Sequence, residues 1–364
     1  MNLTESLKEK YSKEEISAYQ AQKLAQIIAF GPVVFQVARI MIKWGIFEML
    51  DEQPLTESEV AEKAGISKYA AKCLLESALT MSMVLVDPET DRYSLSKVGF
   101  FLLNDKSTRV NVDFNHDVNY IGMFDLEASL KNGSPEGLKH FGNWPTVYEG
   151  LSSLPDQVKK SWFAFDHFYS DCSFEEALKI VFRRPVKNLM DVGGNTGRWA
   201  MQCVNFDPKV QVTIVDLPQQ LQMMRQQTAG HKGAERIHGY SANLLDPNSS
   251  LPSNISYEAI WMSQFLDCFG EDEIVSILKR AADIMNPDTR LYIMETLWDR
   301  QQFDTAAFCL TQISLYFTAI ANGNSKMYHS DDLIRLVKMA GLEVEEIHDN
   351  MGLGHSIVVC KGRN

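Results

Sequence analysis

The sequence has neither paired cysteines nor a long apolar run, and both absences limit what the protein can be. Its six cysteines are scattered over 364 residues, with no C-x-x-C pair. Such spacing indicates reduced core thiols rather than disulfides or a metal site. No stretch reaches the roughly 18–20 apolar residues of a membrane-spanning helix, and residues 1–20 lack the apolar segment of a signal peptide. We therefore expect a cytoplasmic protein with no metal site and no membrane partner.

Positive charge is also scarce. The chain has 35 Lys and Arg against 47 Asp and Glu, a formal net charge of -12. Between Pro54 and Phe100, seven acidic residues outnumber five basic ones. Nucleic-acid binding needs a concentrated basic face, so we expect no nucleic-acid partner. The 45% hydrophobic content is that of a globular protein, and the length fits about two domains.

The N-terminal third has the pattern of a helical, winged-helix domain, predicted over residues 1–105. A dense apolar stretch from Ala25 to Leu50 exceeds what one chain can bury, which favours a homodimer. Thr56 followed by Glu59 predicts a capping box at the start of a short helix. A second helix and two alternating segments around residues 87–91 follow, and they predict a β-hairpin wing.

Residues 106–180 are predicted to form a helical connector that contributes to the substrate pocket. They are rich in aromatic side chains, which either pack between domains or wall a pocket for an aromatic substrate. These are Tyr120, Phe124, Phe141, Trp144, Tyr148, Trp162, Phe163, Phe165, Phe168 and Tyr169.

After Pro185 strands and helices alternate, which predicts an α/β domain over residues 181–364. A parallel, doubly wound sheet is the usual arrangement of such a pattern. Two further short strands, Val344–Ile347 and Ser356–Cys360, are predicted to follow a last helix. The main strands are predicted at Asn188–Val192, Val210–Val215, Ala259–Met262 and Leu291–Met294.

The most specific motif is a strand that runs into a glycine-rich turn and then a helix, over residues 189–197. Gly193 and Gly194 let the backbone pass close to a ligand. Asp216 ends the next strand, where a carboxylate can accept both hydroxyls of a ribose. The G-x-G-x-x-G pattern of dinucleotide sites fails, because Asn195 and Arg198 stand where glycines are required.

These motifs resemble those of S-adenosylmethionine (SAM)-dependent O-methyltransferases of small molecules, a family with plant phenolic, hydroxyindole and polyketide-tailoring members. The resemblance covers roughly residues 25–360 and implies a Rossmann-like catalytic domain behind an N-terminal winged-helix dimerisation domain, with SAM as cofactor. It is carried by the phrases Trp44–Phe47, Arg92–Leu95, Asp191–Gly197, Val215–Pro218 and Ala340–Leu342.

The resemblance also implies which residues contact the cofactor. The glycine turn meets the methionine part of SAM, Asp216 meets the ribose, and the segment after the next strand meets the adenine. Asn243 stands where the family has an Asp, and Ser263 stands where it has a Lys. The implied cofactor residues are Gly193, Gly194, Asp216, Leu217, Asn243, Leu244 and Ser263.

The catalytic pattern departs from that of the family. Asp267 stands in the position of the histidine that takes a proton from the substrate hydroxyl. Of the two glutamates that orient this histidine, one is retained as Glu295, and Met327 replaces the other. Asp267 is either a base with a raised pKa or only the cap of the helix that begins near Glu271. His329 is a second candidate for the base.

The resemblance thus implies methyl transfer from SAM to a hydroxyl oxygen of a small, aromatic acceptor. The alternative is a SAM-binding family member that has lost ordinary methyl transfer and does other chemistry or only binds its ligand. The loss of the histidine and of one glutamate keeps that alternative open.

Overall fold

The computed structural model describes residues 5–363, and the chain divides into two units between Asp117 and Val118. This boundary falls inside the segment predicted as a connector. Each unit has its own core and is described by itself.

The N-terminal unit consists of helices and one antiparallel hairpin. The capping box is confirmed, because the Thr56 side chain accepts from the Glu59 N–H and the Glu59 carboxylate accepts from the Thr56 N–H. The predicted hairpin is also present, with Val84 opposite Leu95. The elements are α1 (Glu5–Tyr11), α2 (Ala18–Ala29), α3 (Gly31–Lys43), α4 (Ile46–Glu52), α5 (Glu57–Ala64), α6 (Lys68–Thr80), β1 (Val84–Val86), β2 (Tyr93–Leu95), α7 (Lys97–Asn104) and α8 (Lys106–Phe114).

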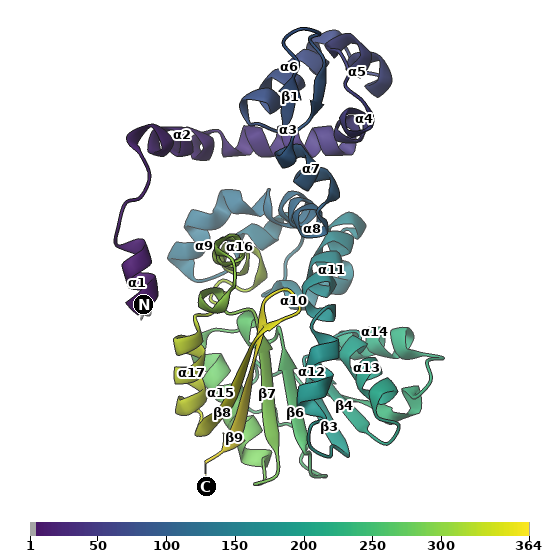
Figure 1. The fold of residues 1–364 in the computed structure, drawn as a ribbon. Helices are drawn as coiled ribbons and strands as arrows, with labels where there is room; N and C mark the ends of the chain where they lie inside the picture. Colours follow the sequence, from purple (N-terminus) through teal and green to yellow (C-terminus); the bar gives the residue numbers. More distant parts are fainter. Residues whose placement is uncertain (1–4, 364) are drawn as a thin grey trace. The chain divides into compact units, whose positions relative to one another are not determined.

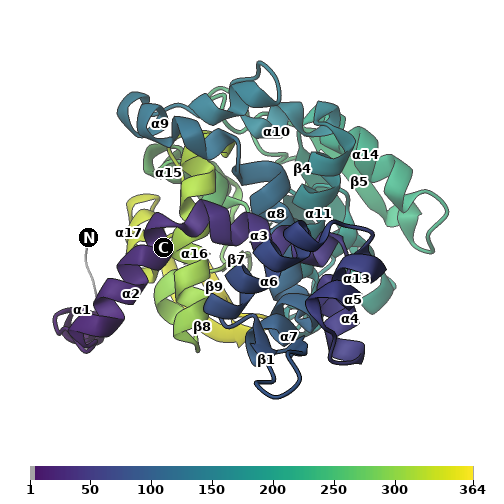
Figure 2. The ribbon, with the colours of Figure 1, turned by 90° about the horizontal axis from the view of Figure 1, so that it is seen from above.

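None of the side chains of helix α2 is buried. Helix α3 is amphipathic instead and buries Ala38, Met41 and Ile42. The two helices meet at an angle of 70°, which is visible from above (Figure 2). In residues 5–363 no single helix is long and apolar enough to cross a membrane, and this bent pair meets the length and composition of a span only when taken together.

The C-terminal unit begins with short helical segments and then two longer helices. A π-helical turn, η1 (Asn115–Asn119), crosses the boundary between the units. The segments that follow are η2 (Gly122–Asp125), α9 (Leu126–Asn132), η3 (Glu136–His140), α10 (Val147–Gly150), η4 (Leu151–Ser153), α11 (Asp156–Asp171) and α12 (Phe174–Val181).

A seven-stranded sheet in the order β5-β4-β3-β6-β7-β9-β8 forms the centre of this unit (Figure 1). Strands β3 to β7 pair in parallel, and β9 and β8 pair antiparallel at one edge. The expected doubly wound α/β fold is confirmed, and β5 is a strand that the sequence pattern did not predict. The strands are β3 (Asn188–Val192), β4 (Gln211–Asp216), β5 (Ile237–Ser241), β6 (Ala259–Ser263), β7 (Arg290–Glu295), β8 (Leu342–Met351) and β9 (His355–Gly362).

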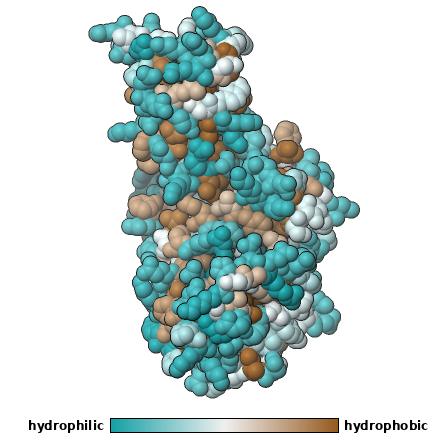
Figure 3. Space-filling view, turned by 90° about the vertical axis from the view of Figure 1, so that its right-hand side faces the viewer, coloured by the Kyte–Doolittle hydropathy of each residue, from teal (hydrophilic) through white to brown (hydrophobic). Residues whose placement is uncertain are grey.

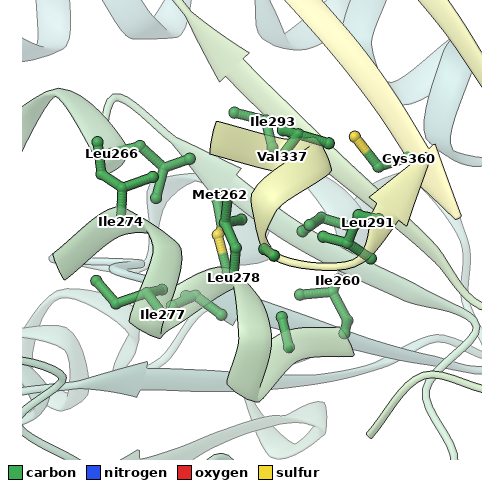
Figure 4. Close-up of a cluster of buried hydrophobic side chains, with 14 of the residues drawn as sticks. Ile260, Met262, Leu266, Ile274, Ile277, Leu278, Leu291, Ile293, Val337 and Cys360 are labelled. Carbon is green, nitrogen blue, oxygen red and sulfur yellow. The ribbon is translucent and has the colours of Figure 1, made fainter. Parts of the chain in front are cut away.

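Alternate residues of the buried strands pack on opposite faces of the sheet. Helices α15 (Glu271–Ile284) and α17 (Ser330–Met339) cover one face, where Val337 lies beside Ile293 and Ile274 lies beside Leu266 (Figure 4). Helices α12, α13 and α14 cover the other face, where Trp199 stacks on Trp261. The helical elements of this part are α13 (Arg198–Phe206), α14 (Pro218–Thr228), η5 (Ala234–Arg236), η6 (Leu266–Cys268), α15 (Glu271–Ile284), η7 (Trp298–Arg300), α16 (Asp304–Tyr316), η8 (Phe317–Ala321) and α17 (Ser330–Met339).

Candidate active site

The carboxyl ends of four neighbouring parallel strands bring the predicted cofactor residues to one edge of the sheet. Gly193 follows β3, Asp216 ends β4, Asn243 comes two residues after β5, and Ser263 ends β6. The chain runs outward from β3 through β4 to β5 and then returns to place β6 on the other side of β3. Ligands of open α/β sheets bind at such a reversal of strand order.

The glycine turn after β3 has no room for a side chain. Gly193 has a φ of +75°, and a Cβ there would lie 2.2 Å from the ring of Phe265. A Cβ on Gly194 would lie 2.5 Å from the carboxylate of Asp191. Asn195 is also left-handed, with a φ of 48°. Local packing therefore disfavours a side chain at both glycines, and the backbone conformation adds a second requirement at Gly193.

The Asp216 carboxylate is held in place by the backbone. Oδ2 accepts from the N–H of Asn195 at 2.8 Å, and Oδ1 accepts from the N–H of Leu217 at 2.7 Å. Burial raises the pKa of Asp216 to about 6, against the effect of these two hydrogen bonds. Each carboxylate oxygen can accept a second hydrogen bond, so the group retains the capacity to bind two vicinal hydroxyls.

Three other predicted cofactor residues lie at the same edge, but each in a different environment. Asn243 is exposed, and its Oδ1 accepts from the N–H of Leu245 at 3.0 Å. Leu244 is buried, and its carbonyl oxygen accepts from Arg280 at 2.6 Å. Ser263 is half-buried. The contacts of these residues with a cofactor stay predictions.

Asp191 is a buried acid at this edge that was not predicted as a site residue. It is 2% exposed, and its Oδ2 has no hydrogen-bond partner among the described residues. Burial and the charge of Asp216 raise the pKa of Asp191 to about 8. Its place inside the apolar strand β3 was the signal that could have singled it out.

The two predicted catalytic carboxyl groups lie together next to this edge. Asp267 lies in the η6 turn after β6, and Glu295 ends β7. Oε1 of Glu295 accepts from the N–H groups of Phe265 and Leu266 at 3.1 and 2.8 Å, while Oε2 is buried without a partner among the described residues. Burial raises the pKa of Asp267 to about 7. Burial and the charge of Asp267 raise the pKa of Glu295 well above its ordinary value.

Groups that the sequence had not singled out as catalytic surround Asp267. The thiol of Cys268 lies 3.4 Å from Oδ1 of Asp267. The Tyr148 hydroxyl is buried, and both the burial and the neighbouring thiol raise the pKa of this tyrosine. Trp162 donates from Nε1 to the Tyr316 hydroxyl at 2.7 Å. Of the aromatic side chains predicted to pack or to wall a pocket, Tyr148 thus lies near Asp267, and Trp162 is linked to this group through Tyr316.

One further carboxyl group, that of Asp166 in α11, interacts electrostatically with Asp267. Burial and the charge of Asp267 raise the pKa of Asp166 to about 7. This neighbour could not be predicted from the sequence, because Asp166 lies in a helix far from Asp267 along the chain.

Two family models match the chain. Residues 156–343, which hold the glycine turn and both predicted catalytic carboxyl groups, match the O-methyltransferase domain. Residues 22–93 match the Dimerisation2-like domain. The chain belongs to the O-methyltransferase family. It is therefore an enzyme of small-molecule methylation, and the cofactor of this family is S-adenosylmethionine.

Known relatives of this methyltransferase are distant. It is 22% identical to the L-tyrosine C(3)-methyltransferase of Streptomyces lavendulae over 306 residues, or 83% of this chain and 81% of the relative. It is 20% identical to the mitomycin biosynthesis 6-O-methyltransferase of the same organism over 331 residues, or 89% and 90% of the two chains. The solved structure of mitomycin 7-O-methyltransferase has the same fold, with a TM-score of 0.71, 18% identity and coverage of 95% and 98%.

The residues at the carboxyl edge of this methyltransferase fit SAM. The side-chain-free turn at Gly193 lets a ligand approach the backbone, and Asp216 offers a buried carboxylate to ribose hydroxyls. The positive end of helix α13, which begins directly after Gly197, lies at the same turn and suits the carboxylate of the methionine part.

The structure does not support two alternatives for the catalytic pattern of this methyltransferase. Asp267 is not the cap of α15, because that helix has Gly270 at its N-cap and the Glu273 carboxylate accepts from the Gly270 N–H at 2.7 Å. His329 is the N-cap of α17, where Nδ1 accepts from the Asp331 N–H and Nε2 lies 3.6 Å from the Asp299 carboxylate.

Met327 stands where the family has its second glutamate, so this position supplies no carboxyl group. It is buried, and its sulfur accepts from the Thr296 hydroxyl at 3.2 Å. Of the two glutamates that orient the catalytic group in the family, only Glu295 is therefore present here.

Proposed function

We propose that this methyltransferase methylates a hydroxyl oxygen of a small aromatic acceptor, with Asp267 as the group that receives the hydroxyl proton. The observation that carries the proposal is the buried pair of Asp267 and Glu295, which lies beside the predicted cofactor residues at the carboxyl ends of the parallel strands. SAM supplies an electrophilic methyl group on its sulfonium. The acceptor oxygen forms a bond to this methyl carbon as the carbon–sulfur bond breaks, and the proton passes to Asp267.

The raised pKa of Asp267 makes this proton transfer feasible. An ordinary Asp lies about 6 pKa units below a phenol, a gap of about 8 kcal/mol. With its pKa raised to about 7, Asp267 reduces the gap to a phenol to about 4 kcal/mol. Glu295, held by two backbone N–H groups, fixes the turn that carries Asp267. Alignment of the acceptor supplies the larger part of the rate, up to about 7–11 kcal/mol.

The acidity of the acceptor follows from the same comparison. Even with its pKa raised to about 7, Asp267 stays about 3 pKa units below a phenol, so it suits a hydroxyl more acidic than that of an ordinary phenol. We infer an acceptor whose own substituents lower its pKa. Tyr148 and Tyr316, whose hydroxyl groups interact with Asp267, support an aromatic ring as the binding partner.

A competing function is SAM binding without ordinary transfer, which the loss of the second glutamate at Met327 favours.

A direct experiment distinguishes methyl transfer to oxygen from SAM binding without transfer. The enzyme is mixed with SAM carrying a 13C-labelled methyl group and with phenols and quinols of graded acidity, and the product is followed by NMR. A methyl signal on oxygen supports the proposal. A methyl signal on carbon points to the chemistry named for the L-tyrosine C(3)-methyltransferase, and binding of SAM without any product supports the competing function.

We also propose that the enzyme is a homodimer. The N-terminal unit matches a dimerisation domain. Helix α2 has no buried side chain, and Ile28 on it is 71% exposed. An exposed apolar surface can be buried against the same surface of a second copy of the chain, so we expect α2 to contact its counterpart in the partner subunit. The cytoplasmic location stays a prediction from composition.

A further inference from the structure

A buried histidine outside the carboxyl pair links three segments of the C-terminal unit. His355, the first residue of β9, is fully buried. Its Nδ1 lies 3.0 Å from the Ser173 hydroxyl, just before α12, and its Nε2 lies 3.1 Å from Oε1 of Gln264, just after β6. Both ring nitrogens are thus engaged, and no step of methyl transfer uses them.

The chemistry of the partners fixes the direction of these hydrogen bonds. The amide oxygen of Gln264 can only accept, so Nε2 of His355 carries a proton and donates it. Burial lowers the pKa of His355 to about 4, so the ring is neutral at neutral pH and its Nδ1 accepts. Ser173 is the donor to Nδ1, although its hydroxyl also lies 3.3 Å from the Met351 carbonyl oxygen.

Gln264 is the corner at which the chain leaves the sheet toward Asp267. Its φ of +45° lies in the left-handed region, which residues other than glycine rarely adopt and which persists only when the surroundings enforce it. The Gln264 N–H donates to the Met294 carbonyl oxygen at 2.9 Å. The next two N–H groups donate to Glu295. Glu295 therefore holds the backbone after the corner, and His355 holds the side chain of the corner itself.

We propose that His355 is a positioning residue, and that the hydrogen-bonded chain Ser173–His355–Gln264 fixes the corner from which Asp267 is presented to the acceptor. Loss of this chain loosens the 264–268 segment and lowers turnover, while the glycine turn and Asp216 keep their affinity for SAM. The kinetic part rests on the proposed function. The structural part does not, because it concerns the enzyme without substrate.

The test compares His355→Leu with His348→Leu in the full chain. His348 lies in the neighbouring strand β8, where it pairs with the Glu346 carboxylate, so it controls for the loss of an imidazole in the same hairpin. In His355→Leu we expect faster amide hydrogen exchange in residues 264–268, a kcat lower by about 10–100-fold and an unchanged Kd for SAM. The apparent pKa of the rate should fall, because water reaches Asp267. His348→Leu should behave as the wild type.

Two further variants keep the proposal falsifiable if His355→Leu does not fold. Gln264→Met removes the acceptor at the half-buried end of the chain and should reproduce the effects. His355→Gln keeps a donor toward Gln264 and should restore part of the turnover. Wild-type exchange in residues 264–268 of folded variants, or a loss of kcat matched by an equal loss of SAM affinity, overturns the proposal. Faster exchange combined with a wild type that methylates no acceptor supports the role of His355 in the corner and overturns the proposed function.

Discussion

Asp267 is the residue on which the proposed chemistry depends, and its substitution tests the proposed proton transfer. Asp267→Asn keeps the size of the side chain but removes its basicity. We expect kcat to fall by about 10²–10⁴-fold, the usual contribution of a general base, with an unchanged Kd for SAM by calorimetry. The loss should shrink for acceptors of lower pKa, because a hydroxyl that is already ionised needs no base. Asp272→Asn, an exposed acid in the first turn of α15, is the matched control.

The pH dependence of the same reaction has a defined sign. Asp267 accepts a proton only when it is ionised, and its pKa is raised to about 7. The kcat of the wild type should therefore rise with pH through about 7 and level off above it, whereas an ordinary Asp would give no such rise above pH 5. Equal rates for Asp267→Asn and the wild type with every acceptor would show that alignment alone drives the transfer.

Substitution of Asp216 tests the predicted cofactor site separately. Asp216→Ala removes the carboxylate that accepts from Asn195 and Leu217 and that we assign to the ribose hydroxyls. We expect SAM binding to be lost in calorimetry, while circular dichroism shows the fold retained, because charge-assisted hydrogen bonds are the stronger ones. Asp283→Ala, on the exposed face of α15, serves as the control. An unchanged SAM affinity in Asp216→Ala removes this residue from the site.

At the scale of elements, the turn after β3 should tolerate no side chain. Gly193→Ala combines a positive φ with a Cβ 2.2 Å from the Phe265 ring, so the turn or that ring must shift. Gly133→Ala has a φ of +66° and open space around its Cβ, so it should cost only about 1–2 kcal/mol of backbone strain. We expect thermal unfolding to show a larger loss for Gly193→Ala, together with loss of SAM binding. Equal losses in the two variants would mean that packing against Phe265 is unimportant.

The elements that the sequence predicted are those whose signals are local. Thr56 and Glu59 are three residues apart, and their mutual hydrogen bonds need no other part of the chain. Strand β5 was missed because its five residues are partly or fully exposed at the edge of the sheet, and they therefore lack a continuous apolar run.

The candidate site was predictable only in part. The glycine turn and Asp216 follow from the order of strands and turns. The partnership of Asp267 with Glu295 came from the family resemblance alone, because no spacing along the chain brings the ends of β6 and β7 together. The left-handed Gln264 and its contact with His355 were beyond prediction, since nothing in a glutamine indicates that conformation and the histidine lies in the last strand.

At the scale of the whole molecule, the exposed apolar surface is the feature that a single chain leaves unexplained. Figure 3 shows apolar side chains as brown patches among hydrophilic ones. On α2 and α3, Ile28 is 71% exposed and Val33 is 58% exposed. Surfaces of this kind usually mark an interface, and both residues fall within the Ala25–Leu50 segment for which the sequence predicted dimerisation.

The double variant Ile28→Glu, Val33→Glu tests the homodimer. In a symmetric dimer each substitution occurs twice in one interface, so four carboxylates enter an apolar contact and repel each other. We expect sedimentation velocity at micromolar concentration to give the mass of a dimer for the wild type and of a monomer for the variant, with a lower unfolding temperature because dimerisation no longer stabilises the fold. Tyr69→Glu, at a residue of α6 that is 79% exposed and outside this segment, should remain dimeric. A folded wild type with the mass of a monomer, or a double variant that dimerises as tightly as the wild type, contradicts the prediction.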